Sequence, residues 1–274
     1  MRKNSFNNTL RVVLGVSLIC SLMVSATAIL LHPKQRQNQR LDRIGNILAV
    51  AGLYESGIDI EAVYRQNIVP QMIALDSGDV VDPEKFDETL NIEAFDIQTL
   101  TSDPRYSASV PPQYDKAKIK QRPQYMAVYR VETDRHLQKL ILPIYGRGLW
   151  STLYGFIALD KDLRTITGIT FYEHKETPGL GGEVDNRQWK NSWKGKQAFD
   201  DQGRVVIEVV RGEVEPDSGD ADHQVSGLSG ATITSRGVNN LVRYWLGEHG
   251  YGPYLNALEQ ARKQKNFADN NGPE

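Results

Sequence analysis

The sequence predicts an α+β fold, in which a mostly antiparallel sheet packs with helices and is preceded by one N-terminal transmembrane helix. Three observations carry this prediction. Residues 12–31 hold no charge, several runs after residue 124 are rich in Val, Ile, Tyr and Thr, and the segment after Thr232 repeats its apolar residues at helical spacing. A chain of 274 residues is long enough for one large domain or two small ones.

Composition excludes several classes of protein. Charged residues make up 24% and hydrophobic residues 40%, which is ordinary for a globular protein, and a net charge of −2 gives no reason to expect a nucleic-acid partner. The single cysteine, Cys20, excludes an intrachain disulfide and a cysteine-based metal site. The five histidines show no ligand spacing, so we predict no metal site.

The first predicted element is a membrane anchor over residues 1–33. The twenty uncharged residues 12–31 would span roughly 30 Å as a helix, at about 1.5 Å per residue. The alternative is a signal peptide cleaved after Ala28, which would release a soluble secreted protein. The apolar run continues to Leu31, and this favours the anchor. Basic residues flank both ends, slightly more of them after the span, so the charge count leans towards a cytoplasmic location for the large domain.

Residues 34–101 predict juxtamembrane helices and an insert. An amphipathic helix over 34–58 would end at Gly57, and Asp59 would cap a second helix over Ile60–Asn67. Turns and short strands follow from Val69 to about Thr101. Residues 102–124 contain four prolines and predict a loop.

Residues 125–274 form the predicted main domain. The expected strands are Tyr125–Val131, Leu137–Tyr145, Leu153–Leu159, Ile166–Tyr172 and Val205–Val210. Asp134-Arg135 supplies the first turn between them. The apolar stripe Val238, Leu241, Val242, Trp245 and Leu246 predicts a helix after Thr232, and a last helix begins at Pro253.

A cluster of hydroxyl side chains precedes the helix after Thr232. Four hydroxyls lie within Ser229–Ser235, so they fall at the start of that helix. Helix N-termini present unpaired N–H groups and partial positive charge, which suit a phosphate. The alternative is an ordinary N-cap, because Ser and Thr favour that position.

Two glycine-rich loops accompany this cluster. Residues 145–151 (YGRGLWS) contain two glycines, which let a backbone approach a ligand closely, and Trp150, which offers a planar face. Residues 174–182 (HKETPGLGG) contain three glycines and one proline. Alone, each loop could be a structural turn; together with the hydroxyl cluster they favour a ligand site.

The motifs resemble those of a known family. Ser229-Gly230-Ala231-Thr232 resembles the motif of FMN-binding domains whose flavin is held by a phosphoester to the last threonine, and residues 146–151 and 174–181 resemble two other marked segments. Over nearly its full length, including Asn46–Ala49, the chain resembles the C subunits of bacterial sodium-translocating NADH:quinone reductases.

This resemblance implies a function. It implies one FMN bound covalently to Thr232 by a separate flavin transferase that uses FAD as donor. It also implies an electron-relay role in an inner-membrane assembly of six subunits, which couples NADH oxidation by quinone to sodium export. The soluble domain of this single-pass protein would then face the periplasm, contrary to the charge count. The implied cofactor-binding residues are Thr232, Ser229, Gly230, Ala231, Thr234, Gly148, Trp150, Glu176, Thr177 and Leu180, with no catalytic residue of the chain's own.

Two alternatives stay open at this point. The related G subunit of Rnf-type electron-transport complexes has the same flavin and anchor, but the long segment between about Ile58 and Gln124 favours the reductase family. The other alternative is a membrane-anchored binding module without a cofactor. One departure from the family motif is Ser226, which stands where an aspartate is often found three positions before the Ser/Thr.

Overall fold

A computed structural model describes residues 3–93 and 95–270. The ends of the predicted anchor (1–2) and of the predicted main domain (271–274) lie outside the described residues. The chain divides into two compact units, Met1–Arg43 and Ile44–Glu274. The helices are α1 (Lys3–Ala51), α2 (Ile60–Asn67), α3 (Ile97–Ser102), α4 (Arg187–Asn191), α5 (Thr232–Leu246) and α6 (Gly252–Asn270), with 3₁₀ helices η1 (Pro83–Lys85), η2 (Gly181–Asp185) and η3 (Ala221–His223). The strands are β1 (Ile68–Ala74), β2 (Ser107–Ser109), β3 (Gln121–Pro123), β4 (Tyr125–Thr133), β5 (His136–Arg147), β6 (Thr152–Asp160), β7 (Ile166–Glu173), β8 (Glu208–Val209) and β9 (Gln224–Val225).

Within the first unit, residues 3–43 belong to α1. By length and composition, this helix is long and apolar enough to cross a membrane, and none of its most apolar window is buried. The helix continues to Ala51, where the second unit has already begun. The predicted end at Gly57 was therefore wrong. Gly52 ends the helix instead, because its φ of 76° is incompatible with a further helical turn, and Lys139 Nζ donates to the Ala51 carbonyl at 2.6 Å.

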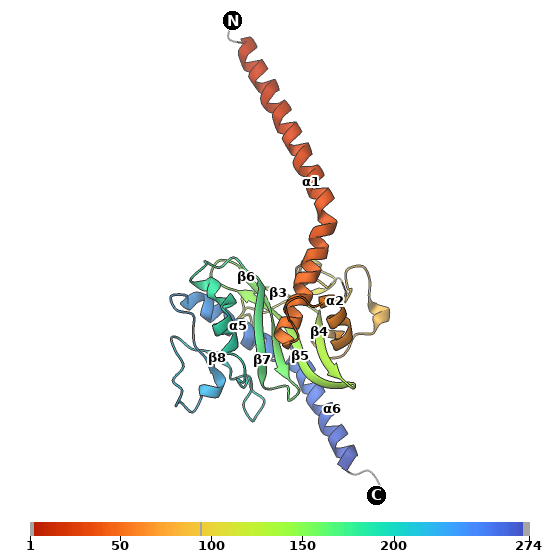
Figure 1. The fold of residues 1–274 in the computed structure, drawn as a ribbon, viewed down its shortest axis with the longest axis vertical. Helices are drawn as coiled ribbons and strands as arrows, with labels where there is room; N and C mark the ends of the chain where they lie inside the picture. The colour runs from red at the N-terminus through yellow and green to blue at the C-terminus, as the bar shows by residue number, and fades with distance from the viewer. Residues whose placement is uncertain (1–2, 94, 271–274) are drawn as a thin grey trace. The chain divides into compact units, whose positions relative to one another are not determined.

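The second unit is built on a five-stranded sheet in the order β1-β4-β5-β6-β7, with every neighbouring pair antiparallel. Figure 1 shows strands β4 to β7 with the C-terminal turns of α1 at the sheet. Four of the predicted strands become β4, β5, β6 and β7. The turn between β4 and β5 uses Asp134 and Arg135 with φ of 51° and 62°, as in the tight turns that join hairpins. The predicted α+β fold class is confirmed.

The remaining strand of the sheet is β1, and not the predicted run Val205–Val210. β1 pairs along its whole length with β4, from Ile68↔Val131 to Ala74↔Tyr125. The strand predicted over 205–210 is confirmed only at Glu208–Val209, which pairs with β9 outside this sheet. The N–H groups of Val206 and Ile207 both donate to the Ala198 carbonyl instead. The predicted loop 102–124 contains the short paired strands β2 and β3.

Two predicted helix features are confirmed. Asp59 caps α2, because its Oδ1 accepts from Glu61 and Ala62 N–H, each at 3.1 Å. In α5 the predicted apolar stripe is buried throughout, with exposed fractions of 0–1%. That stripe faces the sheet.

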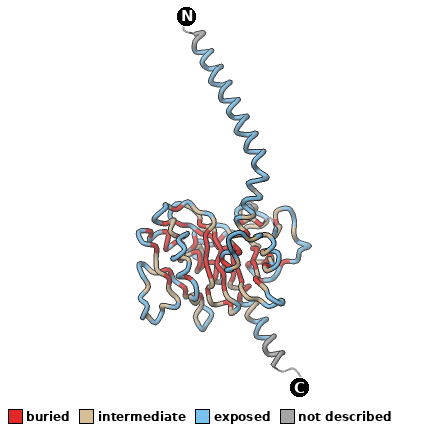
Figure 2. The backbone as a smooth tube through the Cα atoms, in the orientation of Figure 1, coloured by how far each residue is buried: buried red, intermediate tan, exposed pale blue. Residues whose placement is uncertain are grey.

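The core lies on both faces of the sheet. Every residue of β5 from Leu140 to Gly146 is buried, which requires cover on both sides. Figure 2 shows the buried residues concentrated in these strands. α5 lies so close to β5 that a Cβ on Gly146 would be 2.6 Å from Leu241 Cβ, and the end of α1 lies against β7, where a Cβ on Gly168 would be 3.1 Å from the Val50 oxygen. This packing fixes the start of α5 next to the β5–β6 hairpin.

Candidate functional site

Three segments meet around the N-terminus of α5. They are the tip of the β5–β6 hairpin (148–151), the loop after β7 (174–182) and the turn 229–231 that leads into the helix. The hairpin tip is closed by Gly148 N–H donating to the Ser151 carbonyl at 2.8 Å. The loop after β7 turns on Thr177, whose carbonyl accepts from Leu180 and Gly182 N–H at 3.1 and 2.9 Å. Both predicted glycine-rich loops and the hydroxyl cluster therefore come together.

Glu176 connects these segments. Its side chain is only 5% exposed. Oε1 accepts from the N–H groups of Trp150 and Ser151 at 2.9 and 3.2 Å. Oε2 accepts from Leu149 N–H at 3.2 Å and from Thr234 Oγ1 at 2.6 Å. We call Glu176, Thr234 and the N–H groups of residues 149–151 the Glu176 cluster.

Two glycines leave room for this carboxylate. A Cβ on Gly148 would lie 2.6 Å from Glu176 Oε1, and a Cβ on Gly181 would lie 2.5 Å from Thr234 Oγ1 and 2.8 Å from Glu176 Oε2. At such distances, a side chain at either position would displace the Glu176 carboxylate or the Thr234 hydroxyl. The sequence predicts that the backbone at Gly148 approaches a ligand; in the structure, Gly148 and Gly181 both lie against a carboxylate of the chain itself.

The four hydroxyls of the cluster before α5 divide into two pairs. Thr232, the first residue of the helix, and Ser229 are exposed. Thr234 and Ser235 are 0% and 5% exposed. Ser235 Oγ donates to the Ala231 carbonyl at 3.1 Å and accepts from Leu228 N–H at 2.8 Å. Only the exposed pair can meet a ligand.

The N-terminus of α5 carries no side-chain cap. The N-cap residue is Ala231, and no side chain accepts a hydrogen bond there, so the alternative of an ordinary Ser/Thr cap is wrong. Gly230 precedes it with a φ of 70°, and a Cβ there would be 3.1 Å from Leu180 Cδ2. The turn is thus accessible, and Leu180 lies directly beside it.

Large apolar side chains are exposed on the hairpin tip, on the loop after β7 and on the first turn of α5. Leu149, Trp150, Leu180 and Ile233 are 40%, 64%, 45% and 46% exposed. Grouped exposed apolar side chains mark binding surfaces. Leu149 and Ile233 were missed from the sequence, although Ile233 gives a signal: it falls outside the buried stripe of α5. Of the other predicted residues, Thr177 and Gly230 are exposed and Ala231 is buried.

Ser226, at the position of the family's aspartate, has a structural role. Its Oγ accepts from Val214 N–H at 3.0 Å, and its carbonyl accepts from Trp189 Nε1 at 2.8 Å. The hydroxyl therefore holds the preceding loop against the segment that leads into Ser229.

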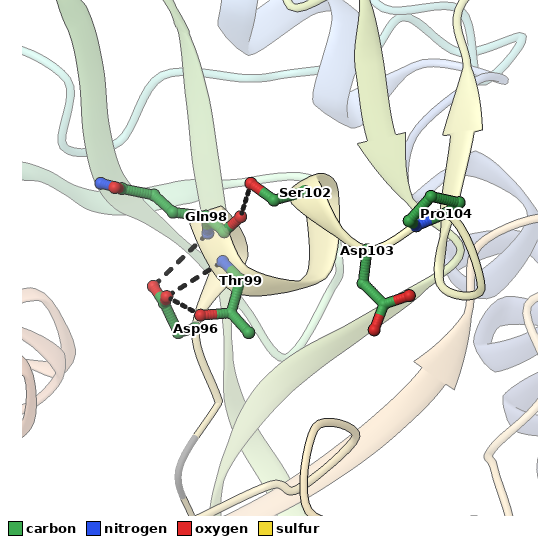
Figure 3. A pocket seen from close by; sticks show the side chains of 6 residues that line it. All are labelled: Asp96, Gln98, Thr99, Ser102, Asp103 and Pro104. Carbon is green, nitrogen blue, oxygen red and sulfur yellow. Dashed lines mark hydrogen bonds between the residues drawn. The ribbon is translucent and has the colours of Figure 1, made fainter.

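A separate polar hollow lies at α3. Its lining residues are Asp96, Gln98, Thr99, Ser102, Asp103 and Pro104. Figure 3 shows the Asp96 carboxylate accepting from residues of the helix's own first turn, at Gln98 N and Thr99 N and Oγ1. The hollow shares no residue with the segments around α5. Across residues 3–93 and 95–270, no three His, Cys, Asp or Glu side chains are grouped to hold a metal ion.

Acid is expected to weaken the Glu176 cluster. Burial raises the pKa of Glu176, but hydrogen bonds from Thr234, Trp150, Ser151 and Leu149 lower it by more, so the pKa lies below the ordinary 4.5. A lowered pKa stabilises the fold above the unfolded-state pKa, and this stabilisation is lost as pH falls through the folded-state pKa. The difference in melting temperature between wild type and Glu176→Gln should therefore shrink below about pH 4.5, measured by circular dichroism from pH 7 to 3.

The matched control is Glu173→Gln, whose exposed side chain lies three residues earlier, at the end of β7. It should melt like the wild type at each pH. A wild-type advantage over Glu176→Gln that stays constant down to pH 3 would contradict the prediction.

Comparisons with known proteins agree with one another. The profile of the FMN-binding domain family matches residues 148–247, which contain every predicted site residue. A Pseudomonas aeruginosa protein, named as the C subunit of a Na(+)-translocating NADH-quinone reductase, is 44% identical over 261 residues, covering 94% of this chain and 98% of that protein. A Haemophilus ducreyi protein of the same name is 41% identical over 254 residues, covering 92% and 94%. The crystal structure of Shewanella oneidensis NqrC is similar with a TM-score of 0.72 and 35% identity, covering 83% of this chain and 99% of that one.

Proposed function

The chain belongs to the C-subunit family of Na⁺-translocating NADH-quinone reductases, and from this premise we propose that it carries FMN covalently on Thr232 and relays electrons within such a complex. Membership confirms the family that the motifs indicated and favours it over the G subunit of Rnf-type complexes. The observation that carries the proposal is the exposed Thr232 hydroxyl on the open first turn of α5.

The first turn of α5 suits the flavin phosphate. The N–H groups at a helix start and the helix dipole favour an anion. Because Ala231 provides no side-chain cap, a phosphoester on Thr232 would meet these N–H groups without displacing a protein group. Arg236, exposed one turn further along α5, adds positive charge on the same side.

The exposed apolar side chains suit the flavin ring. Trp150 and Leu180, together with Leu149 and Ile233, offer a surface that the protein itself leaves uncovered. The exposed Thr177 lies on the same loop as Leu180 and supplies a hydroxyl at this surface. Bound FMN accepts and passes on one or two electrons, while the protein sets its position and potential.

Attachment requires a separate enzyme. A threonine hydroxyl is a poor nucleophile unless a base activates it. Glu176 is the carboxylate bonded to this helix turn, and its oxygens already accept four hydrogen bonds, so it is not available to take a proton from Thr232. This supports a flavin transferase, with FAD as donor, as a partner of the chain.

The proposal extends to membrane topology. A single pass through the inner membrane by residues 12–31 would place the unit Ile44–Glu274 on the periplasmic side of an assembly of six subunits that couples electron transfer to sodium export. Large domains translocate largely regardless of nearby charge, so the basic residues after the span do not oppose this. The span contains no acidic residue, which makes it a poor sodium site.

Intact mass tests the proposal. The full chain, co-expressed with a flavin transferase, should gain the mass of FMN less one water, and peptide mapping should place the addition on the peptide containing Thr232. A chain with its unmodified mass, or an addition on another peptide, would overturn the assignment.

A further inference from the structure

We propose that the Glu176 cluster positions the two walls of the flavin site, the hairpin tip 149–151 and the first turn of α5, without Glu176 contacting the flavin. The inference rests on the proposed function for the identity of the ligand. Glu176 and Thr234, two of the predicted cofactor-binding residues, thus position other parts of the site and do not contact the flavin themselves.

The carboxylate has no acceptor position left for a ligand. An ionised carboxylate offers about four lone-pair sites on two oxygens. Each Glu176 oxygen accepts two hydrogen bonds, at 2.9 and 3.2 Å on Oε1 and at 3.2 and 2.6 Å on Oε2. Gly148 and Gly181 close around the same oxygens. Glu176 can therefore affect a bound flavin only through the residues that donate hydrogen bonds to its carboxylate.

The charge of the carboxylate makes these hydrogen bonds strong. Bonds to an ionised acceptor are shorter and about twice as strong as neutral ones, and a buried setting increases the effect. Three consecutive N–H groups at the hairpin tip converge on one acceptor group. The hairpin tip is thereby held by its backbone while the side chain of Trp150 stays 64% exposed.

The loop that carries Glu176 is held by further hydrogen bonds. His174 Nε2 bonds to Asp185 Oδ2 at 2.8 Å, and its Nδ1 accepts from Glu176 N–H at 3.2 Å. Lys175 N–H donates to Ser151 Oγ at 2.7 Å, which adds a second connection to the hairpin tip. The loop that carries Glu176 is therefore bonded to Asp185 and to Ser151 of the hairpin tip.

At its other end, the Glu176 cluster includes Thr234, a residue of α5. Thr234 lies two residues after Thr232 in the first turn, is fully buried, and donates its hydroxyl to Glu176. One hydrogen bond thus links the turn that carries Thr232 to the hairpin tip that carries Trp150. The packing of α5 against β5 remains without this bond, and we expect its loss to loosen the hairpin tip, with its exposed aromatic face, relative to Thr232.

A pair of Thr234 variants separates hydrogen bonding from packing. Thr234→Val keeps the shape and removes the donor, whereas Thr234→Ser keeps the donor and removes a methyl group. In the flavin-free full chain, in detergent and without the transferase, we expect amide hydrogen exchange in the peptide covering 148–152 to accelerate in Thr234→Val and in Glu176→Gln, and to stay near the wild-type rate in Thr234→Ser. Unchanged exchange in Thr234→Val, or equal acceleration in both Thr234 variants, would overturn the proposal.

The flavin-loaded chain gives the second measurement. With Thr232 intact and attachment verified by mass, Thr234→Val and Glu176→Gln should lower the fluorescence anisotropy of the flavin, and Thr234→Ser should restore it. Wild-type anisotropy in Thr234→Val would refute the positioning role while leaving FMN attachment in place. A wild-type chain without flavin would refute the proposed function, and the exchange experiment would still decide whether the cluster holds the two walls together.

Discussion

Replacing Thr232 by valine is expected to abolish covalent flavin while the protein still folds. Valine keeps the shape of threonine and removes only the hydroxyl. Thr232 is exposed, and its side chain caps nothing, because the N-cap residue of α5 is Ala231. The substitution should therefore cost within about 0.5 kcal/mol of stability, as for other surface positions. The measurement is in-gel flavin fluorescence after denaturation, with both proteins co-expressed with the transferase.

Ser229→Ala is the matched control for this prediction. Ser229 is the other exposed hydroxyl of the motif, three residues upstream, and its loss should leave the fluorescent band in place. A fluorescent band that persists in Thr232→Val would refute attachment at Thr232. A band lost only in Ser229→Ala would move the attachment to Ser229.

The sequence predicts those parts of the fold that depend on local patterns. Strands β4 to β7 follow from runs of β-branched and aromatic residues separated by tight turns, and α5 follows from a stripe whose members prove to be buried. β1 could not be predicted in the same way. Its partner, β4, begins more than fifty residues later, and a register such as Ile68↔Val131 depends on that distant strand.

The candidate site shows the same division between local and distant contacts. The motif around Thr232 and the two glycine-rich loops could be found in the sequence because each is a short segment. The role of Glu176 could not, because its donors lie 25–27 residues upstream and 58 residues downstream. Glycines that admit a ligand and glycines that admit a buried carboxylate look identical in a sequence. Only the contacts of Gly148 and Gly181 separate the two cases.

Trp245→Ala is expected to cause the largest loss of stability. The side chain is fully buried, and Nε1 donates to the Tyr145 carbonyl at 2.6 Å. Its ring centroid lies 5.0, 5.4 and 5.5 Å from those of Tyr145, Tyr244 and Tyr251. Replacing a buried tryptophan by alanine costs about 3–5 kcal/mol, and each kcal/mol lowers the melting temperature by about 2–4 °C in a protein of this size.

Trp150→Ala makes the same chemical change at a side chain that is 64% exposed. Only the backbone N–H of Trp150 belongs to the Glu176 cluster, and the substitution keeps it. Surface substitutions change the free energy of unfolding by about 0.5 kcal/mol or less, so this variant should melt within about one or two degrees of the wild type. It should instead lower the anisotropy of attached flavin. Thermal unfolding of both full-length variants, followed by circular dichroism at one scan rate, tests the pair. If Trp245→Ala melted with the wild type, the packing of α5 against β5 at Trp245 would not supply the stability that its burial predicts.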